Sequence, residues 1–526
     1  MRRDLGDFQT PPELVGMVLE TLGPIGARWP RVLEPTCGRG HFVSGVLAHS
    51  APPREVLGVE IQPEHCHAAG EAIRRHDRPG TYAAITCADF FGLDLARDLT
   101  WHERGPLLVV GNPPWITSAA LGGLGSSSGP PRSNVKRLAG LEARTGSANF
   151  DVAEAVWLKL ARELTGENPT IAILCKTSVA RGLLAFARGA GLPVTDASIR
   201  RIDAERWFSA SVDACLFRAT ITGNADGTEA GSESLDRGSV PVFANLDVDE
   251  PVEMIGFARD RPVADLAAYM RCAFADGECP LTWRQGIKHD AAAVMELVVE
   301  PKTGRLVNGL GESVDVEAGF VYPLLKGADL RRPASDRPRR AAIVTQRRIG
   351  EDTSRLECEA PRLWRYLASH AARFDRRRSS IYRGRPTFSL FGVGPYSFAP
   401  HKVAVSGLYR SPSFRAIGPR DGQPSVFDDT CYFVACDTAA EAAAVSAVCN
   451  DPIAIELLGA LSFAGVKRPV TKALLRRLDL RAIAARADRG RLRDRALTAA
   501  VELEGEDNAR PGEPVEKALE SLWGVA

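Results

Sequence analysis

The feature that most constrains the fold is an alternation of apolar and amphipathic segments between about residues 30 and 220. The apolar runs read RVLEP, EVLGVE, YAAITCAD, LLVVGN, TIAILCK and DACLFRATI, and segments such as HFVSGVLAHS and DVAEAVWLKLARELT have helical spacing. Strands that are apolar at nearly every position are typical of a parallel sheet covered by helices on both faces. The alternation therefore predicts an α/β domain with a mostly parallel sheet.

The rest of the chain differs in character. Residues 223–240 are polar and rich in Gly and Ser, which is typical of an exposed linker. After about residue 280, short strand signals alternate with Gly/Pro turns, and helical patterns return from about residue 438. At 526 residues the chain exceeds what one core serves. We therefore expect an α/β domain over 1–222, a linker and connecting segment over 223–280, a mixed, β-rich domain over 281–480, and a helical or mobile tail over 481–526.

Bulk composition excludes several classes of protein. Hydrophobic residues make up 45% of the chain, the formal net charge is +1, and no apolar run is long enough to span a membrane. The eleven cysteines include no CxxC pair and no cluster at zinc-binding spacing, and the first residues lack the pattern of a signal peptide. We expect reduced thiols, no metal site, no membrane partner and a cytoplasmic location.

The first candidate site is RVLEPTCGRGHFV, residues 31–43, where a strand ends at Glu34 and a helix opens near His41. In an open parallel sheet such a turn lies at the carboxyl end of the strands, where ligands bind. Gly38 and Gly40 permit close backbone approach, and the helix N-terminus offers free N–H groups to a carboxylate or phosphate. The same residues would also suit a plain tight turn between strand and helix.

The next two strand ends carry acids. Glu60 ends the run VLGVE, where a carboxylate would hold a ribose diol, and Ile61 beside it would cover an adenine ring. Asp89 ends the following strand and could accept from an adenine amino group, with Phe90 against the ring. Each acid alone could be a solvated strand end, but a Gly-rich end followed by two acidic ends in order favours a nucleotide-like ligand.

The stretch GNPPWI, residues 111–116, follows the apolar run LLVV. Pro113 restricts Asn112 to an extended conformation, so the Asn112 amide and the Pro113 carbonyl are presented rigidly. Two acceptors that converge on an exocyclic amino group localise its lone pair, as methyl transfer to a weak nucleophile requires. Trp115 supplies a flat face on which a base can stack. The alternative interpretation is an Asn-Pro turn with a buried Trp.

Five motifs occur in a characteristic order: FQTPPELV (8–15), LEPTCGRGHF (33–42), GVEIQP (58–63), ADFF (88–91) and NPPW (112–115). Together they resemble the gamma-class, Taq-like, adenine-specific DNA methyltransferases of restriction–modification and phage-defence systems. The resemblance covers about residues 1–220. It implies a Rossmann-like catalytic domain over 1–222 that binds S-adenosylmethionine, and a target-recognition domain over 281–480.

The resemblance also implies roles for individual residues. It implies that S-adenosylmethionine is bound by Phe8, Thr10, Glu34, Cys37, Gly38, Gly40, Glu60, Ile61, Asp89 and Phe90. The active-site stretch would be Asn112, Pro113, Pro114 and Trp115, with Phe208 of RWFSASVDACLF as the second aromatic residue of the base pocket. Trp115 stands where the family usually has Tyr or Phe, and it keeps and enlarges the aromatic face.

Basic clusters concentrate in the second half, at 329–340, 345–348, 373–386 and 466–477. One such cluster is ordinarily solvated surface, but four in one half favour a positively charged cleft for duplex DNA. MELVVEPKTG, together with Asp290, superficially suits a metal-dependent nuclease through Glu300 and Lys302, but a hairpin with a Lys-Thr-Gly turn is the preferred interpretation. GGLGSSSGPPRSN, which follows the active-site stretch, is a flexible loop or a flap over a flipped base.

The expected reaction is direct transfer of a methyl group from S-adenosylmethionine to the exocyclic amino nitrogen of an adenine flipped out of duplex DNA. No Pro-Cys dipeptide stands at this strand exit, so the covalent route to ring-carbon methylation of cytosine is excluded. The alternatives are methylation of a protein glutamine or an RNA base, a fused methyltransferase–nuclease, and a DNA-binding subunit without activity. A cognate restriction endonuclease or defence-system subunits are candidate partners, and DNA binding would place the protein at the nucleoid.

Overall fold

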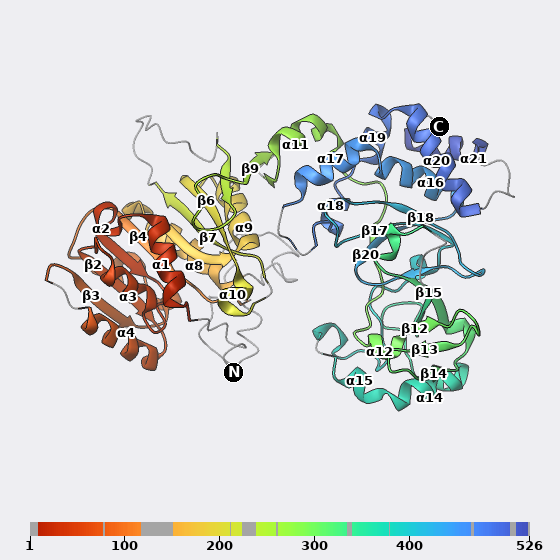
Figure 1. Cartoon of the computed structure of the whole chain (residues 1–526), viewed down its shortest axis with the longest axis horizontal. Helices are drawn as coiled ribbons and strands as arrows, with labels where there is room; N and C mark the ends of the chain where they lie inside the picture. Colours follow the sequence, from red (N-terminus) through yellow and green to blue (C-terminus); the bar gives the residue numbers. More distant parts are fainter. Residues whose placement is uncertain are drawn as a thin grey trace. The chain divides into compact units, whose positions relative to one another are not determined.

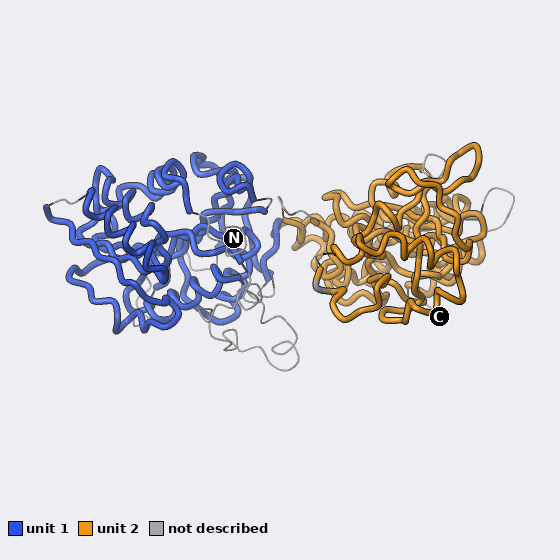
Figure 2. Tube along the Cα trace, turned by 90° about the horizontal axis from the view of Figure 1, so that it is seen from below, with its two compact units in different colours: residues 1–266 blue, residues 267–526 orange. Residues whose placement is uncertain are grey.

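The computed structural model describes residues 9–76, 79–116, 151–210, 212–222, 238–258, 261–333, 339–377, 379–463, 466, 468–504 and 512–523. The chain forms two compact units, residues 1–266 and 267–526 (Figure 2). The division falls within the segment 223–280 that we expected to connect two domains. Phe8, the Gly/Ser-rich run after the active-site stretch and most of the polar linker lie outside the described residues.

Unit 1 is built on a ten-stranded sheet in the order β10-β9-β8-β6-β7-β5-β4-β1-β2-β3 (Figure 1). The strands are β1 (Arg31–Glu34), β2 (Glu55–Glu60), β3 (Tyr82–Cys87), β4 (Leu107–Gly111), β5 (Thr170–Lys176), β6 (Val194–Ile202), β7 (Ala214–Ile221), β8 (Val240–Phe243), β9 (Glu253–Ala258) and β10 (Arg261–Val263). Of these ten described strands, β7 and β9 run against the other eight. The expectation of an α/β domain with a mostly parallel sheet is confirmed.

The sequence patterns missed β6 and the three strands β8 to β10. β6 carries charges that interrupt its apolar pattern. β8 and β10 contain Pro241 and Pro262, and proline is uncommon in strands. The charges are accommodated because Arg201 pairs with Glu253 at 2.8 Å and the Arg200 guanidinium lies 3.9 Å from the centre of the Phe243 ring. Part of the segment that we expected to be a linker therefore extends the sheet.

The helices of unit 1 cover the sheet and place its strand ends. They are α1 (Pro12–Leu22), α2 (Ile25–Arg28), α3 (His41–Ala48), α4 (Pro63–Arg75), α5 (Leu95–Asp98), α8 (Val152–Glu163), α9 (Thr177–Gly189) and α10 (Ala204–Phe208). In α1, Pro12 occupies the first turn and Leu14, Val18 and Leu22 form a buried stripe at helical spacing. α1 packs on α3, which follows β1 after a short turn, so the N-terminus of α3 lies at the carboxyl edge of the sheet.

Unit 2 contains a four-stranded sheet, β11-β20-β17-β18, and a six-stranded sheet, β14-β13-β12-β16-β15-β19. The first sheet comprises β11 (Arg284–Gln285), β17 (His401–Ser406), β18 (Arg415–Ile417) and β20 (Cys431–Cys436). The second comprises β12 (Glu296–Val299), β13 (Leu306–Asn308), β14 (Ser313–Val314), β15 (Val321–Leu325), β16 (Arg340–Ile343) and β19 (Val426–Phe427). All described strand pairs in this unit are antiparallel except β15 with β19, as expected for a mixed, β-rich domain.

The helices of unit 2 are α11 (Leu266–Cys272), α12 (Ala292–Met295), α13 (Leu356–Glu359), α14 (Pro361–Ser369), α15 (Ala371–Asp375), α16 (Ala439–Cys449), α17 (Pro452–Leu461), α18 (Lys472–Leu475), α19 (Leu480–Arg486), α20 (Arg489–Glu504) and α21 (Gly512–Trp523). Among the described residues no single helix could cross a membrane; α16 and α17, bent by 58°, pass on length and composition only when taken together.

The C-terminal helices are not a separate tail. α20 and α21 pack against α16, which is buried almost all round, and Leu492, Ala496 and Ala500 form the buried stripe of α20. The sequence suggested a charged, mobile end because this stripe consists mostly of small alanine side chains among many charges. Burial of such a stripe depends on the partner helix, which the local pattern does not show.

The segment MELVVEPKTG forms the hairpin of β12 and β13, as we preferred. Glu300 lies in its turn, where it accepts from Thr303 and pairs with Arg305 at 2.7 Å. Asp290 instead lies 3.6 Å from Lys288. These contacts engage the two acids separately, so the arrangement gives no support to a nuclease site at this hairpin.

Candidate active site

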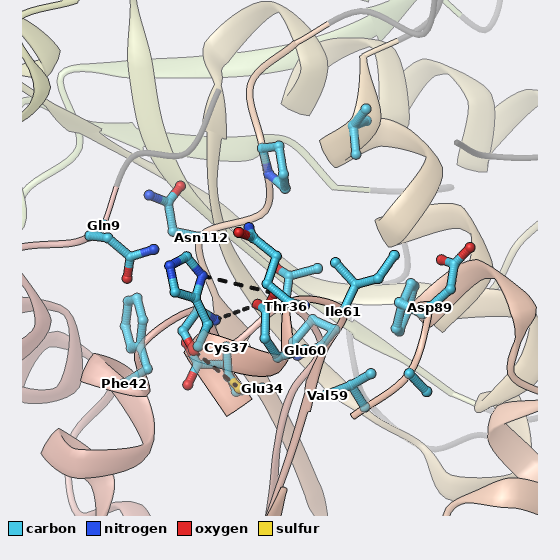
Figure 3. A pocket seen from close by; sticks show the side chains of 18 of the residues that line it. Gln9, Glu34, Thr36, Cys37, Phe42, Val59, Glu60, Ile61, Asp89 and Asn112 are labelled. Carbon is cyan, nitrogen blue, oxygen red and sulfur yellow. Dashed lines mark hydrogen bonds and ion pairs between the residues drawn. The ribbon is translucent and has the colours of Figure 1, made fainter. Parts of the chain in front are cut away.

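Strand order in unit 1 reverses at β1, which lies between β2 and β4. In open sheets ligands bind at such a switch point, beyond the carboxyl ends of the strands. A cavity of about 430 Å³ opens there, within the range of small-molecule sites. Figure 3 shows Gln9 and Asn112 at one end of this cavity and Asp89 at the other. The predicted residues that line it are Thr10, Glu34, Cys37, Gly38, Glu60, Ile61, Asp89, Phe90, Asn112 and Pro114.

The two glycines of the first turn have different roles. Gly38 has φ +52°, its N–H donates to Glu60 Oε2 at 2.8 Å, and an added Cβ would lie 2.8 Å from the Gln9 side chain. Gly40 has φ +80° and does not line the cavity; its Cβ would lie 2.9 Å from that of Ala69 on α4. Gly38 therefore shapes the cavity, whereas Gly40 allows α3 to pack closely on α4.

Two acids give the centre of the cavity its electrostatic character. Glu34 is 3% exposed, and its Oε2 accepts from the Val43 N–H in the first turn of α3 at 3.0 Å. Burial raises the pKa of the Glu34 carboxyl well above its usual range; the Val43 hydrogen bond opposes this shift and the charge of Glu60 adds to it. Glu60 accepts from Gly38 and from the Gln62 N–H, both at 2.8 Å. A positively charged ligand next to Glu34 would favour the ionised carboxylate and oppose this shift.

The far end of the cavity combines an acid with apolar surfaces. Asp89 caps the short helix η1 (Phe90–Gly92), with its Oδ1 accepting from the Phe91 N–H at 3.0 Å. Phe90 is buried, whereas Ile61 leaves 43% of its surface exposed beside the opening. An exposed isoleucine next to a carboxylate is an arrangement that a flat, partly polar ring would cover well.

The active-site stretch begins where β4 ends. The Asn112 Nδ2 donates to Thr10 Oγ1 at 3.1 Å, which ties the stretch to the segment preceding α1. Asn112 and Pro114 line the cavity. Pro113 and Trp115 are buried outside the lining, and the Trp115 indole N–H donates to the Leu174 carbonyl at 3.1 Å.

Trp115 and Phe208, the two aromatic residues expected to form the base pocket, do not lie on opposite sides of an open space. Their ring centres lie 5.1 Å apart, and the planes meet at 74°, in edge-to-face contact. Both side chains belong to the core that packs around α1 and α3. The structure therefore places the two predicted aromatic residues in direct contact and leaves no room for a base between them in this arrangement.

Several polar residues of the cavity escaped sequence reasoning. His41 opens α3, and its Nδ1 donates to the Thr10 carbonyl at 2.6 Å, because a carbonyl oxygen can only accept. Gln9, Thr36 and His65 also line the cavity. The only available signal was proximity to a motif, since Thr36 and His41 lie within LEPTCGRGHF and Gln9 within FQTPPELV.

The predicted cofactor, S-adenosylmethionine, fits these residues. It carries two positive charges, a ribose diol and an adenine ring, and the cavity offers the acids Glu34 and Glu60 and the exposed face of Ile61. The Thr36 hydroxyl is buried and lacks a hydrogen-bond partner among the described residues. A buried polar atom without a partner at a cavity wall is a natural contact for a polar ligand.

Comparisons with known proteins identify methyltransferases as relatives of the chain. No protein-family model matches the chain. It is 34% identical over 483 residues to the Type II methyltransferase M.NspV of Nostoc sp., which covers 91% of this chain and 97% of that protein. It is 33% identical over 117 residues to the Type II methyltransferase M.CvrRI of Paramecium bursaria Chlorella virus XZ-6E, which covers 22% and 26%.

Among solved structures, the type IIL restriction–modification enzyme MmeI, determined in complex with DNA, has a similar fold. It is 11% identical, the TM-score is 0.50, and the match covers 98% of this chain and 73% of that one. This likeness extends the similarity of fold over both units. Given the identity to M.NspV along nearly the whole of both chains, this chain belongs to the Type II methyltransferase family of restriction–modification enzymes, which use S-adenosylmethionine as methyl donor.

Proposed function

We propose that the protein methylates the exocyclic amino nitrogen of adenine at a defined sequence in duplex DNA, within a restriction–modification or phage-defence system. The observation that carries the proposal is the position of Asn112. Its side chain lies at the end of β4 and lines the same cavity as Glu34, Glu60 and Asp89, so the amide stands next to the place where the methyl donor fits. Binding of DNA would keep the protein in the cytoplasm, at the nucleoid.

The chemistry follows from the acceptors at this strand end. When bound, S-adenosylmethionine supplies an electrophilic methyl group on a positively charged sulfur. The Asn112 amide oxygen and the Pro113 carbonyl oxygen accept the two hydrogens of the adenine amino group. This localises the lone pair on the nitrogen, and the prolines keep both acceptors in place without a reorganisation cost. The acceptors do not distinguish adenine from other amino-bearing groups, so the choice of adenine rests on the resemblance of the ordered motifs.

Entry of a flipped adenine requires one aromatic ring to move. The Trp115 indole is held by its hydrogen bond to Leu174, whereas a phenyl ring has no hydrogen-bonding group to hold it. We therefore assign the movement to Phe208, which lies at the end of the five-residue helix α10. Stacking of the base on an aromatic face would contribute about 1–3 kcal/mol and offset much of the cost of unstacking.

A cluster of cations and aromatic rings in unit 2 supports duplex DNA as the partner. We define the basic–aromatic cluster as Arg284, Arg347, Arg385, Phe391, Tyr396 and Phe398. The guanidinium groups of Arg284, Arg347 and Arg385 lie 4.6, 5.1 and 5.9 Å from the centres of the Tyr396, Phe398 and Phe391 rings, respectively. In the described part of the chain none of the three arginines pairs with a carboxylate, so their charges are available to phosphates and base edges.

Hydrogen bonds join the loops that carry this cluster. Lys288 and Phe391 exchange backbone hydrogen bonds at 2.8 and 2.9 Å, and the Leu390 N–H donates to Gln346 Oε1 at 2.7 Å. The basic runs at 345–348 and 373–386 thus contribute to one surface, together with Arg284, which belongs to neither run. By contrast, ion pairs engage three cations of the other runs: Arg340 with Asp329, Arg468 with Asp429 and Arg477 with Asp276.

The test is to identify the methylated product. Purified protein is incubated with tritiated S-adenosylmethionine and, in separate reactions, with duplex DNA of mixed sequence, structured RNA and a glutamine-containing protein substrate. We expect label in DNA only and, after digestion to nucleosides, in N6-methyldeoxyadenosine only. Label in methylated cytosine, in RNA or in protein would refute the proposed substrate while leaving the family membership intact.

A further inference from the structure

The active-site stretch has an unusual shortage of backbone donors. Pro113 and Pro114 carry no N–H group, so this part of the backbone cannot be held by donating to a neighbouring strand. Proline fixes the local φ angle, but it does not fix the position of the whole stretch, which depends on other contacts. Its anchors must therefore be side chains at its two ends and donors that reach its carbonyl groups.

One of those donors is the side chain of Lys176, the last residue of β5. Its Nζ donates to the Trp115 carbonyl at 2.8 Å and to Asp151 Oδ2 at 2.6 Å. β5 pairs in parallel with β4, so both strands end at the same edge of the sheet. Lys176 thus reaches from one strand end to the stretch that leaves the other.

Asp151 in turn is fixed by α8. It is the N-cap of that helix, and its Oδ1 accepts from the Ala153 N–H at 3.1 Å. The Asp151 side chain is 8% exposed and that of Lys176 is 24% exposed, so the pair is largely shielded from water. The next residue, Val152, donates its N–H to the Ile116 carbonyl at 2.9 Å. The carbonyl groups of Trp115 and Ile116 are therefore both held by the start of α8, one through Lys176 and one directly.

We propose that Lys176, paired with Asp151, is a positioning residue that holds the Trp115 carbonyl and thereby fixes Asn112 and the Pro113 carbonyl against the target amino group. The inference rests on the proposed function of Asn112. Lys176 does not line the cavity and is not a catalytic residue. Displacement of a reacting group by about 1 Å can cost roughly 100-fold in rate, so loss of this anchor acts on the chemical step.

The experiment compares the steady-state rates at which four variants form the methylated product that the wild-type protein makes. Lys176→Met should lower kcat about 100-fold and leave the KM and Kd for S-adenosylmethionine nearly unchanged. Lys176→Arg keeps a charged donor and should recover much of the rate. Asp151→Asn keeps the oxygen that accepts from the Ala153 N–H but loses the second oxygen, which accepts from Lys176, and should lose less of the rate because Lys176 still reaches the Trp115 carbonyl. The double variant Lys176→Met/Asp151→Asn should lose no more than Lys176→Met alone, because the two residues act as one unit.

Lys159→Met is the matched control. Like Lys176, Lys159 on α8 is a largely buried lysine of unit 1, and its Nζ contacts both a carbonyl, that of Leu93, and a carboxylate, that of Glu163, each at 2.6 Å. Its substitution should reduce thermal stability about as much as Lys176→Met does, but leave kcat at saturating cofactor unchanged. Equal losses of kcat in the two variants, or a Lys176→Met enzyme with wild-type kcat, would overturn the inference.

The two proposals fail in different ways. If methylation occurs at a group other than the adenine amino nitrogen, the proposed substrate is wrong. The kcat of Lys176→Met on the actual substrate then still tests whether Lys176 positions the active-site stretch. If Asn112→Ala abolishes transfer but Lys176→Met does not reduce it, the active site stands and Lys176 has only a structural role.

Discussion

The two units of this protein achieve opposite electrostatic character within a chain whose formal net charge is only +1. In unit 1 the cavity gathers three acids, Glu34, Glu60 and Asp89. In unit 2 the basic–aromatic cluster gathers arginines that have no carboxylate partner among the described residues. The net charge of the chain therefore does not indicate the charge of either binding partner, because the charges of the two sites offset each other in the sum.

The units also differ in how their sites are assembled. The cavity of unit 1 takes most of its residues from the ends of β1, β2, β3 and β4, which are consecutive in the chain and adjacent in the sheet, with β4 beside β1. The cluster of unit 2 takes its residues from loops separated by tens of residues, and hydrogen bonds such as that from Leu390 to Gln346 bring them together. A strand-end site can be recognised from its motifs, whereas a loop-built surface requires the tertiary structure.

The largest expected effect tests whether chemistry belongs to unit 1 alone. Asn112→Ala removes one of the two acceptors for the amino group and should lower kcat roughly 1000-fold, with the Kd for S-adenosylmethionine little changed. Asn245→Ala, in an exposed turn of the same unit outside the cavity, is the matched control and should leave kcat unchanged. Wild-type kcat in the Asn112 variant would falsify its assigned role.

The second prediction concerns the acidic character of the cavity. Glu60→Ala removes the acceptor for Gly38 and Gln62 and the proposed partner of the ribose, and should weaken cofactor binding about 30- to 100-fold. Calorimetric titration with S-adenosylmethionine measures this change. Glu64→Ala, an exposed acid in the first turn of α4, should bind as the wild type does. Comparable affinity in both variants would mean that Glu60 is a structural acid only.

The third prediction contrasts the pH responses of the units. Burial raises the pKa of Glu34, so folded unit 1 holds more protons than the unfolded chain above about pH 4.3, and its stability falls as pH rises through the folded pKa. Burial lowers the pKa of Lys402 on β17 to about 7, against about 10.4 when unfolded, so stability of unit 2 rises with pH between these values.

Hydrogen exchange of peptides from β1 and β17 measures the two responses separately. From pH 7 to 9, unit 2 should gain roughly 2 kcal/mol, a gain that Lys402→Met abolishes. The falling trend of unit 1 should disappear in Glu34→Gln, which mimics the protonated acid. Trends of the same sign in both units, after correction for intrinsic exchange, would contradict this contrast.

The smallest effect tests the cationic character of unit 2. Arg347→Ala and Arg284→Ala should each weaken DNA binding by about 1 kcal/mol and reduce the salt dependence of the affinity by about one counterion. Arg362, which pairs with Asp315 at 2.6 Å, provides the matched control and should change neither quantity. Fluorescence anisotropy over a range of salt concentrations gives both values. An equal effect at Arg362 would place DNA elsewhere on the unit.

Much of unit 1 was predictable because local signals agreed with the fold. The apolar runs became β1 to β5 and β7, and the expected helices became α3 and α8. β6 was missed because its arginines find partners, Glu253 and the Phe243 ring, that lie far along the chain. The stripe of α20 was missed for the same reason, since small alanines indicate burial only when a partner helix is present.

The candidate site shows the same limit at the level of single residues. The strand-end motifs predicted that Glu34, Glu60 and Asp89 would meet, and they line one cavity. They did not predict that Gly40 would serve helix packing, or that Trp115 and Phe208 would touch edge to face. Nor did any motif indicate Lys176, whose role depends on the carbonyl and carboxylate that it meets.

The sequence by itself determined the alternation of strands and helices, the order of the strand-end motifs and the kinship to Type II methyltransferases. These properties are local or sequential, because a strand end, its turn and the following helix are contiguous in the chain. Only the tertiary structure decided which described arginines pair with carboxylates, how the aromatic rings meet and what anchors a stretch with two prolines. Those outcomes depend on contacts between residues distant in the chain, which no local pattern encodes.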